Sequence, residues 1–146
     1  MSMRLEAVIQ ELEEKGRLGK EREHLQHGTT TVFEHSVHVA YVSLRFAEKF
    51  HIRVDTLALL RGALLHDYFL YDWHRPNHGH GLHGFTHPRT ALENASKDFV
   101  LTEIEKNIIA RHMFPLTFLP PTCREAWIVC LADKYCALQE TLFTAG

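Results

Sequence analysis

The sequence predicts an all-α fold, arranged as one domain over its 146 residues. Apolar residues recur at helical spacing along most of the chain, and Ser, Thr or Asp precedes several of these stretches as a helix cap would. We find no alternating apolar run, hairpin turn signal or internal repeat. The content of 45% apolar and 23% charged residues is that of an ordinary globular protein. We therefore expect a single compact helical domain over residues 1–146, with a peripheral N-terminal helix in 1–20 and a core in 28–140.

Three helices are predicted in the first half of the chain. Residues 3–15 (MRLEAVIQELEEK) form a charged amphipathic helix that the following glycines stop. Thr29 to Thr31 offer N-caps to a second helix, whose apolar face runs from Phe33 to Ala47. Asp55 can cap a third helix (TLALLRGALLHDYFL), which is apolar on most sides and is therefore expected to lie at the centre.

The second half begins with a predicted loop over residues 71–87, which contains one proline and three glycines. Pro88 suits the first position of a fourth helix, PRTALENASK. The capping box Thr102-x-x-Glu105 opens a fifth helix that reaches about Met113. A second box, Thr122-x-x-Glu125, opens the last one, REAWIVCLADKYCALQETLF.

Composition narrows the classes of partner. The net charge is −2 and no dense Lys/Arg cluster occurs, which argues against a nucleic-acid polymer or an anionic membrane as partner. No apolar stretch has the length of a membrane span, and residues 1–20 are too charged for a signal peptide. Three cysteines without a C-x-x-C pair are typical of reduced thiols in a cytoplasmic protein, which is the location we expect. A homodimer is possible, and the sequence does not decide the oligomeric state.

Histidine is the unusual residue, with twelve in the chain. His35, the doublet His66-Asp67, His112 and Asp133 each interrupt an apolar helical stretch. A buried imidazole or carboxylate is costly unless it is compensated by an ion pair, a helix-end hydrogen bond or a metal ion. One divalent cation bound by two of these histidines and both aspartates would compensate those four side chains together. Nitrogen and carboxylate ligands without thiolate favour Mn, Fe, Mg, Co, Ni or Zn.

These residues resemble the H…HD…D pattern of the HD-domain metal-dependent phosphohydrolase superfamily. The resemblance covers residues 28–140 and includes EHSVHVA around the first histidine, GALLHD around the doublet and LADKY around the last aspartate. It implies a metal site between the central helices, with catalysis centred on His66 and Asp67. A first metal would be held by His35, His66, Asp67 and Asp133.

The resemblance also implies a second metal, held by His87 and His112 with Asp67 bridging the two ions. We expect two ions rather than one. The alternatives are that His87 caps the helix before Pro88, and that His112 interacts with a helix C-terminus.

The function implied is hydrolysis of a phosphate ester, a phosphomonoester or a phosphodiester, by a metal-activated hydroxide. The substrate would be a nucleotide or a small phosphorylated metabolite, and His38, His83 and Lys134 are candidate substrate contacts. A dinuclear-iron oxygenase on the same fold has the same ligand order and is the second hypothesis. A non-catalytic metal- or nucleotide-binding module is the third.

Overall fold

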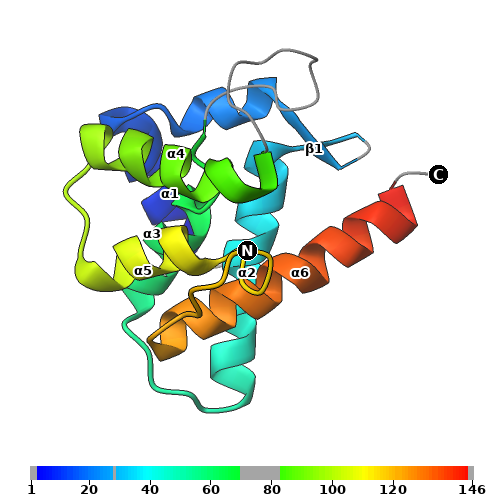
Figure 1. The fold of residues 1–146 in the computed structure, drawn as a ribbon. Coiled ribbons are helices and arrows are strands. Elements are labelled where there is room, and N and C mark those ends of the chain that lie inside the picture. The colour runs from blue at the N-terminus through cyan, green and yellow to red at the C-terminus, as the bar shows by residue number, and fades with distance from the viewer. Residues whose placement is uncertain (1–2, 28, 70–82, 145–146) are drawn as a thin grey trace.

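The computed structural model describes residues 3–27, 29–69 and 83–144 (Figure 1). The helices in chain order are α1 (Met3–Lys15), the 3-10 helix η1 (Leu18–Glu23), α2 (Val32–Lys49), α3 (Thr56–Leu65), α4 (His83–Asp98), α5 (Glu103–Arg111) and α6 (Arg124–Thr144). One short antiparallel hairpin, β1 (Leu25–His27) and β2 (Thr30–Thr31), lies between η1 and α2. The described part of the chain is thus almost entirely helical, which confirms the all-α prediction.

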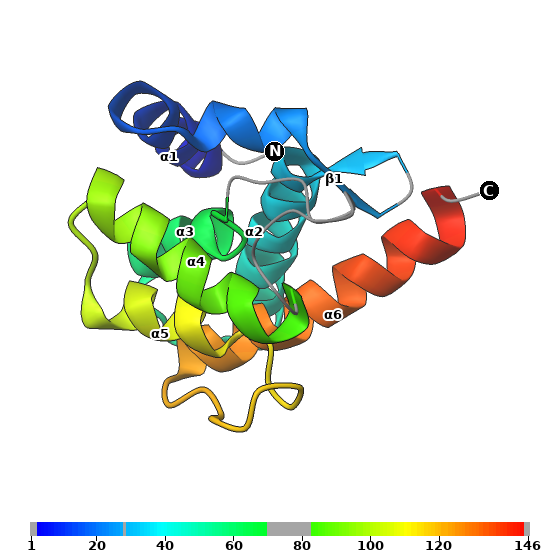
Figure 2. The same ribbon diagram turned by 45° about the horizontal axis from the view of Figure 1, so that its top comes forward.

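Helix α3 lies at the centre, as its apolar sequence predicted, and every residue from Ala58 to Leu65 is buried. Helices α2 and α5 pack against it, and α6 crosses both α2 and α5 (Figure 1). Helix α1 and η1 cover one end of this assembly (Figure 2). Gly62 permits the close approach of α3 to α5, because a Cβ atom at this position would collide with Ile108.

Three predicted helix starts are confirmed by their caps. Thr31 accepts a hydrogen bond from the Glu34 amide and completes a capping box at α2. Thr102 and Glu105 form the same arrangement at α5. The Asp55 carboxylate accepts from the Ala58 amide and begins α3.

Other predicted boundaries were wrong. Helix α4 begins at His83, so Pro88 lies inside it instead of at its first position. The predicted box at Thr122 does not form, because the Thr122 side chain pairs with Asn107 and Glu125 accepts from the Asp55 amide. The hairpin also escaped prediction, since strands of three and two residues are too short to show alternation. The doublet at the end of α3 lies just beyond the helix, which ends at Leu65.

A polar network fastens α1 to the rest of the domain. The Arg17 guanidinium donates to both Asp98 oxygens, at 2.8 and 3.2 Å, from the segment between α1 and η1. The Tyr68 hydroxyl donates to Asp98 and accepts from the Arg17 amide, in each case at 2.6 Å. Three segments distant in sequence therefore meet at the C-terminal end of α4.

Two further observations concern the whole described chain. The thiols of Cys123, Cys130 and Cys136 are free, and the last two are buried. None of the helices in the described ranges combines the length and the apolar character that crossing a bilayer requires.

Candidate metal centre

Two histidines and two aspartates come together from three parts of the fold. His35 lies in the first turn of α2, His66 and Asp67 follow α3, and Asp133 lies in the middle of α6. One nitrogen or oxygen atom from each of them lies within 4.8 Å of the others. The Asp133 Oδ1 atom is 2.7 Å from His35 Nε2 and 3.2 Å from His66 Nε2. These are the four residues that the sequence predicted for a first metal.

Each imidazole around the cluster is oriented through its Nδ1 atom. His66 Nδ1 donates to the Ala63 carbonyl, and His112 Nδ1 donates to the Ile109 carbonyl at 2.8 Å. Both histidines cap the C-terminal end of a helix, so each reaches a carbonyl three residues back that the helix leaves unpaired. His35 Nδ1 donates instead to the Glu140 carboxylate at 2.8 Å. Because carbonyl and carboxylate oxygens only accept, Nδ1 carries a hydrogen in each ring, and Nε2 is the atom turned toward the aspartates.

The two oxygens of Asp67 face different histidines. Oδ2 lies 3.2 Å from His66 Nε2 and 3.8 Å from His35 Nε2. Oδ1 lies 3.4 Å from His112 Nε2 on the other side. A carboxylate in this position has the geometry to join two neighbouring cation sites. His112 thus lies beside the four-residue cluster, where its Nε2 atom faces Asp67.

The carboxylates of the cluster shift the pKa values of its histidines toward the protonated, positively charged form. Burial lowers the pKa of His35, but hydrogen bonds to Asp133 and Glu140 outweigh this effect and raise the pKa to about 9. Burial likewise opposes protonation of His66, yet the charges of Asp67 and Asp133 raise its pKa well above the ordinary value. The pKa of Asp133 is lowered despite its burial, because both histidines donate to it. Protons therefore balance the buried carboxylates in the protein as it stands.

Two residues that the sequence did not point to also belong to the site. Glu140 is buried on α6 and accepts from Nδ1 of both His35 and His38, the latter at 3.0 Å. It lies seven residues after Asp133, a spacing that places both side chains on one face of a helix, and this signal could have revealed it. Gln26 on β1 donates to Asp67 Oδ2 at 3.0 Å. Its strand is too short for a pattern to have indicated which way Gln26 points.

The other residues predicted to bind substrate or a second metal lie around the cluster or in α4. His38 lies one turn after His35, partly exposed and bound to Glu140. The Lys134 ammonium donates to the His112 carbonyl at 3.1 Å and to the carbonyl of Cys130, so it is turned onto its own chain. His83 and His87 both lie in α4, and their side chains are outside the described residues. The proposed N-cap role of His87 is wrong, because the helix already begins four residues earlier.

The donor set fits a divalent cation. Imidazole nitrogens that converge on carboxylates, each with its second nitrogen hydrogen-bonded, are the arrangement found around metal-binding histidines in proteins. The ligands are nitrogen and oxygen without thiolate, which suits Mn, Fe, Co, Ni or Zn and, through the carboxylates, Mg. An ion here would replace the protons that the histidines carry.

The fold and the cluster together define a helical domain with a candidate His/Asp metal centre at the junction of α2, α3 and α6. The family model described as HD domain matches residues 32–138. The chain therefore belongs to the HD domain family, whose members bind divalent metals and include metal-dependent hydrolases. Comparison with curated proteins and with solved structures gave no significant match.

Proposed function

We propose that the protein is a metal-dependent phosphohydrolase that cleaves a phosphate ester of a nucleotide or of a small phosphorylated metabolite. The observation that carries this proposal is the convergence of the His35 and His66 Nε2 atoms on Asp67 and Asp133. Membership of the HD domain family supports it. The family has non-catalytic members as well, so the activity itself needs a direct test.

In this proposal the four-residue cluster holds the first cation. The two faces of Asp67 support a second cation, shared by Asp67 with His112 and, as the resemblance implies, His87. A divalent ion in such a site acts as a Lewis acid on a phosphoryl oxygen and lowers the pKa of bound water to near neutrality. The Nδ1 hydrogen bonds of His35, His66 and His112 hold the rings in place, so binding requires little rearrangement of the chain.

Charge explains why substrate binding depends on the cation. Asp67 and Asp133 present carboxylate oxygens in the same small volume where a phosphate would have to sit. Two anions in contact repel each other, and burial strengthens that repulsion. A bound cation would offer a phosphoryl oxygen a coordination position that the buried protons of His35 and His66 cannot offer, so we expect phosphate esters to bind the metal-loaded protein and not the metal-free one.

Substrate contacts are a separate part of the proposal. His38 is the favoured candidate because its side chain is partly exposed and its Nδ1 is held by Glu140, which leaves the other nitrogen available to a ligand. His83 remains a candidate from the sequence. Lys134 is supported less well, since its ammonium group already has three partners on its own chain.

The test starts from protein stripped of metal and reloaded with Mn or Mg in the absence of oxygen. We expect phosphate or nucleoside monophosphate release from at least one member of a panel of p-nitrophenyl phosphate, bis(p-nitrophenyl) phosphate and common nucleotides. Asp67→Asn should abolish bound metal and release together, because it removes the charge that both cation positions share. His112→Ala should lower the metal content toward one ion per chain with the fold intact, and His24→Ala, a histidine outside the cluster, serves as the control.

Three outcomes would contradict the proposal. Activity confined to iron-loaded protein, with oxygen consumed at each turnover, would establish the oxygenase instead, because oxygen activation needs electrons that Mg cannot supply. Full metal loading with no turnover on any ester would establish a binding module. Retention of all bound metal by Asp67→Asn would refute the ligand assignment itself.

A further inference from the structure

Helix α6 is apolar on both of its faces. The buried face joins the core, whereas the large side chains of Trp127, Leu131, Tyr135, Leu138 and Leu142 lie between 40% and 63% exposed. Their spacing of three or four residues makes one continuous stripe along the helix. A helix that is apolar all round is normally buried on all sides. Within the described part of the chain the Phe114 ring packs against Trp127 at the start of the stripe, and the side chains from Leu131 onward stay more than half exposed.

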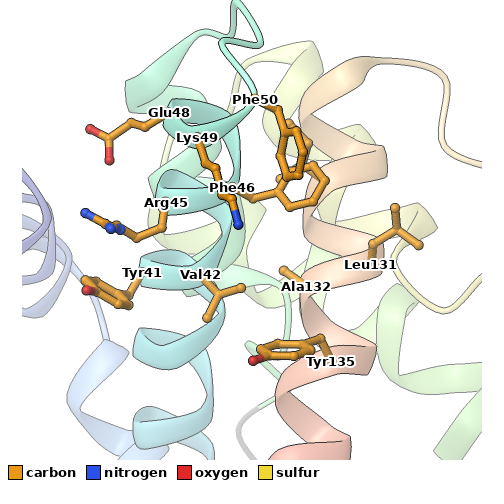
Figure 3. A pocket seen from close by; sticks show the side chains of 11 residues that line it. Tyr41, Val42, Arg45, Phe46, Glu48, Lys49, Phe50, Leu131, Ala132 and Tyr135 are labelled. Atoms are coloured by element: carbon orange, nitrogen blue, oxygen red, sulfur yellow. The ribbon is translucent and has the colours of Figure 1, made fainter.

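A groove adjoins the N-terminal half of this stripe. It lies between α2 and α6, has a volume of about 780 Å³ and is lined by Phe46, Phe50, Ile128, Leu131 and Ala132 among others. Figure 3 shows the rings of Phe46 on α2 and of Phe50, the residue after α2, beside Leu131 and Ala132 on α6. A second hollow of about 410 Å³ shares Phe46, Ile128 and Leu131 with the first and extends to Trp127. Leu138 and Leu142 continue the stripe beyond the groove as a ridge.

We propose that a second copy of this chain covers the stripe, with the α6 helices of the two copies packed antiparallel about a two-fold axis at Tyr135. The ridge and the groove are spaced symmetrically about this residue. Leu138 and Ala132 each lie three residues from Tyr135, and Leu142 and Ile128 each lie seven residues from it. Rotation about the axis therefore brings the ridge of each copy level with the groove of the other. A two-fold interface requires this self-complementarity.

The exposed area agrees with a dimer of ordinary size. A large apolar side chain has roughly 150–250 Å² of surface. The five stripe residues, together with Phe46 and Phe50 at 39% and 57% exposed, therefore leave on the order of 700 Å² accessible. A standard interface buries about 800 Å² on each partner, whereas a monomer seldom exposes more than a few hundred Å² in one apolar patch.

The charges near the axis do not oppose this arrangement. Among the described residues from 127 to 142, Lys134 is the one exposed charged residue on α6. Its ammonium group donates to the carbonyls of His112 and Cys130, which turns it away from the stripe. Three charged residues of α2 line the groove: Arg45 and Glu48 carry opposite charges, and the Lys49 ammonium lies 5.6 Å from the centre of the Phe50 ring (Figure 3). Along α6 itself two copies can therefore meet without bringing free like charges together, while Lys49 of each copy adds a cation to the groove.

The test measures the mass of the full chain in solution by sedimentation equilibrium. We expect twice the chain mass of 16.9 kDa at micromolar concentration. Leu138→Asp places two aspartates at the interface of each dimer. This change should raise the dissociation constant of the dimer by at least about 100-fold. Val100→Asp is the matched control, because Val100 is 95% exposed at a site outside the stripe, and it should leave the mass unchanged.

A covalent test locates the axis. Tyr135→Cys should give a disulfide-linked dimer on mild oxidation, because the two-fold places the two copies of this position side by side. Val100→Cys should give no disulfide-linked dimer, because Val100 lies outside the stripe. A monomeric mass at all concentrations up to about 100 µM would refute the proposal, as would an unchanged dimer in Leu138→Asp that keeps its helical circular dichroism. A monomer that binds phosphatidylcholine/phosphatidylserine vesicles through the stripe would assign the surface to lipid instead.

Discussion

At the scale of single residues, the candidate centre depends as much on the groups behind the histidines as on the histidines themselves. Glu140 contacts the cluster through His35, whose Nδ1 atom it holds. It is therefore a positioning residue, and it also binds His38. A carboxylate behind a histidine fixes the ring and increases its basicity, which strengthens the bond from the other nitrogen to a cation.

We predict that Glu140→Gln weakens binding of Mn or Zn by about 10-fold without changing the number of ions bound. The amide oxygen of Gln still accepts from one imidazole, but the negative charge behind His35 is lost. Competition against a chromophoric chelator measures the affinity. His38→Ala is the control, because it removes the other partner of Glu140 and leaves His35 untouched, and its affinity should change less. Equal affinities for Glu140→Gln and the parent protein would contradict the positioning role.

At the scale of the elements, the site depends on how closely α3 approaches its neighbours. Gly62 lies on the face of α3 that meets Ile108 of α5, and the contact leaves no room for a methyl group. The doublet His66-Asp67 follows one turn later, and His112 follows the end of α5. The packing of these two helices therefore sets the distance between Asp67 and His112.

Gly62→Ala is predicted to destabilise the protein by up to about 2 kcal/mol, because overpacking costs about 1–3 kcal/mol and Ala gains only about 1 kcal/mol over Gly in a helix. Urea unfolding measures the free energy. In Ile108→Val the colliding methyl group is absent, so the double variant Gly62→Ala/Ile108→Val should lose less stability than the two single variants added together. Simple additivity would show that the close approach is not the cause.

The sequence predicted the elements wherever one local pattern was enough. The threonine N-cap offered at 29–31 and the Thr102-Glu105 box need only the residues within one turn, and α2 and α5 begin where these signals place them. The box at Thr122 failed because Asn107, fifteen residues away, competes for the same side chain. The helix start predicted at Pro88 was wrong because α4 begins earlier, at His83, although proline is common in the first turn of a helix.

The same distinction applies to the candidate site. His35, His66, Asp67 and Asp133 were predictable because each interrupts an apolar run, where a polar side chain needs a partner. Gln26 was not, because its role depends on the hairpin folding over Asp67. Nor could the exposed stripe of α6 be told from core residues, since helical spacing shows that residues share a face but not whether that face is covered.

At the scale of the whole molecule, the network of Arg17, Tyr68 and Asp98 connects the N-terminal helix to the core. Burial alone would raise the pKa of Asp98, but the hydrogen bonds from Arg17 and Tyr68 outweigh it and lower the pKa. A carboxylate with a lowered pKa in the folded state stabilises that state above its unfolded pKa of about 4. The stabilisation is lost as the pH falls through the folded pKa.

Asp98→Asn is therefore expected to lower the free energy of unfolding by about 1 kcal/mol at pH 7, a modest effect because the Arg17 side is solvent-exposed. The difference from the parent protein should shrink as the pH falls below about 4, where the parent loses the same charge. Urea unfolding at a series of pH values checks this. A difference that stays constant down to pH 3 would show that the ionised form contributes nothing.

The contact between His35 and Asp133 joins residues 98 positions apart. An N-terminal fragment that lacks α6 cannot contain the four-residue cluster, because α6 supplies Asp133. The same helix supplies Glu140, which binds His35. On a ribosome that adds roughly 5–20 residues per second, His35 emerges several seconds before its partners exist. The candidate centre is therefore completed only when nearly the whole domain has been synthesised, and cation uptake there would report that α6 has docked.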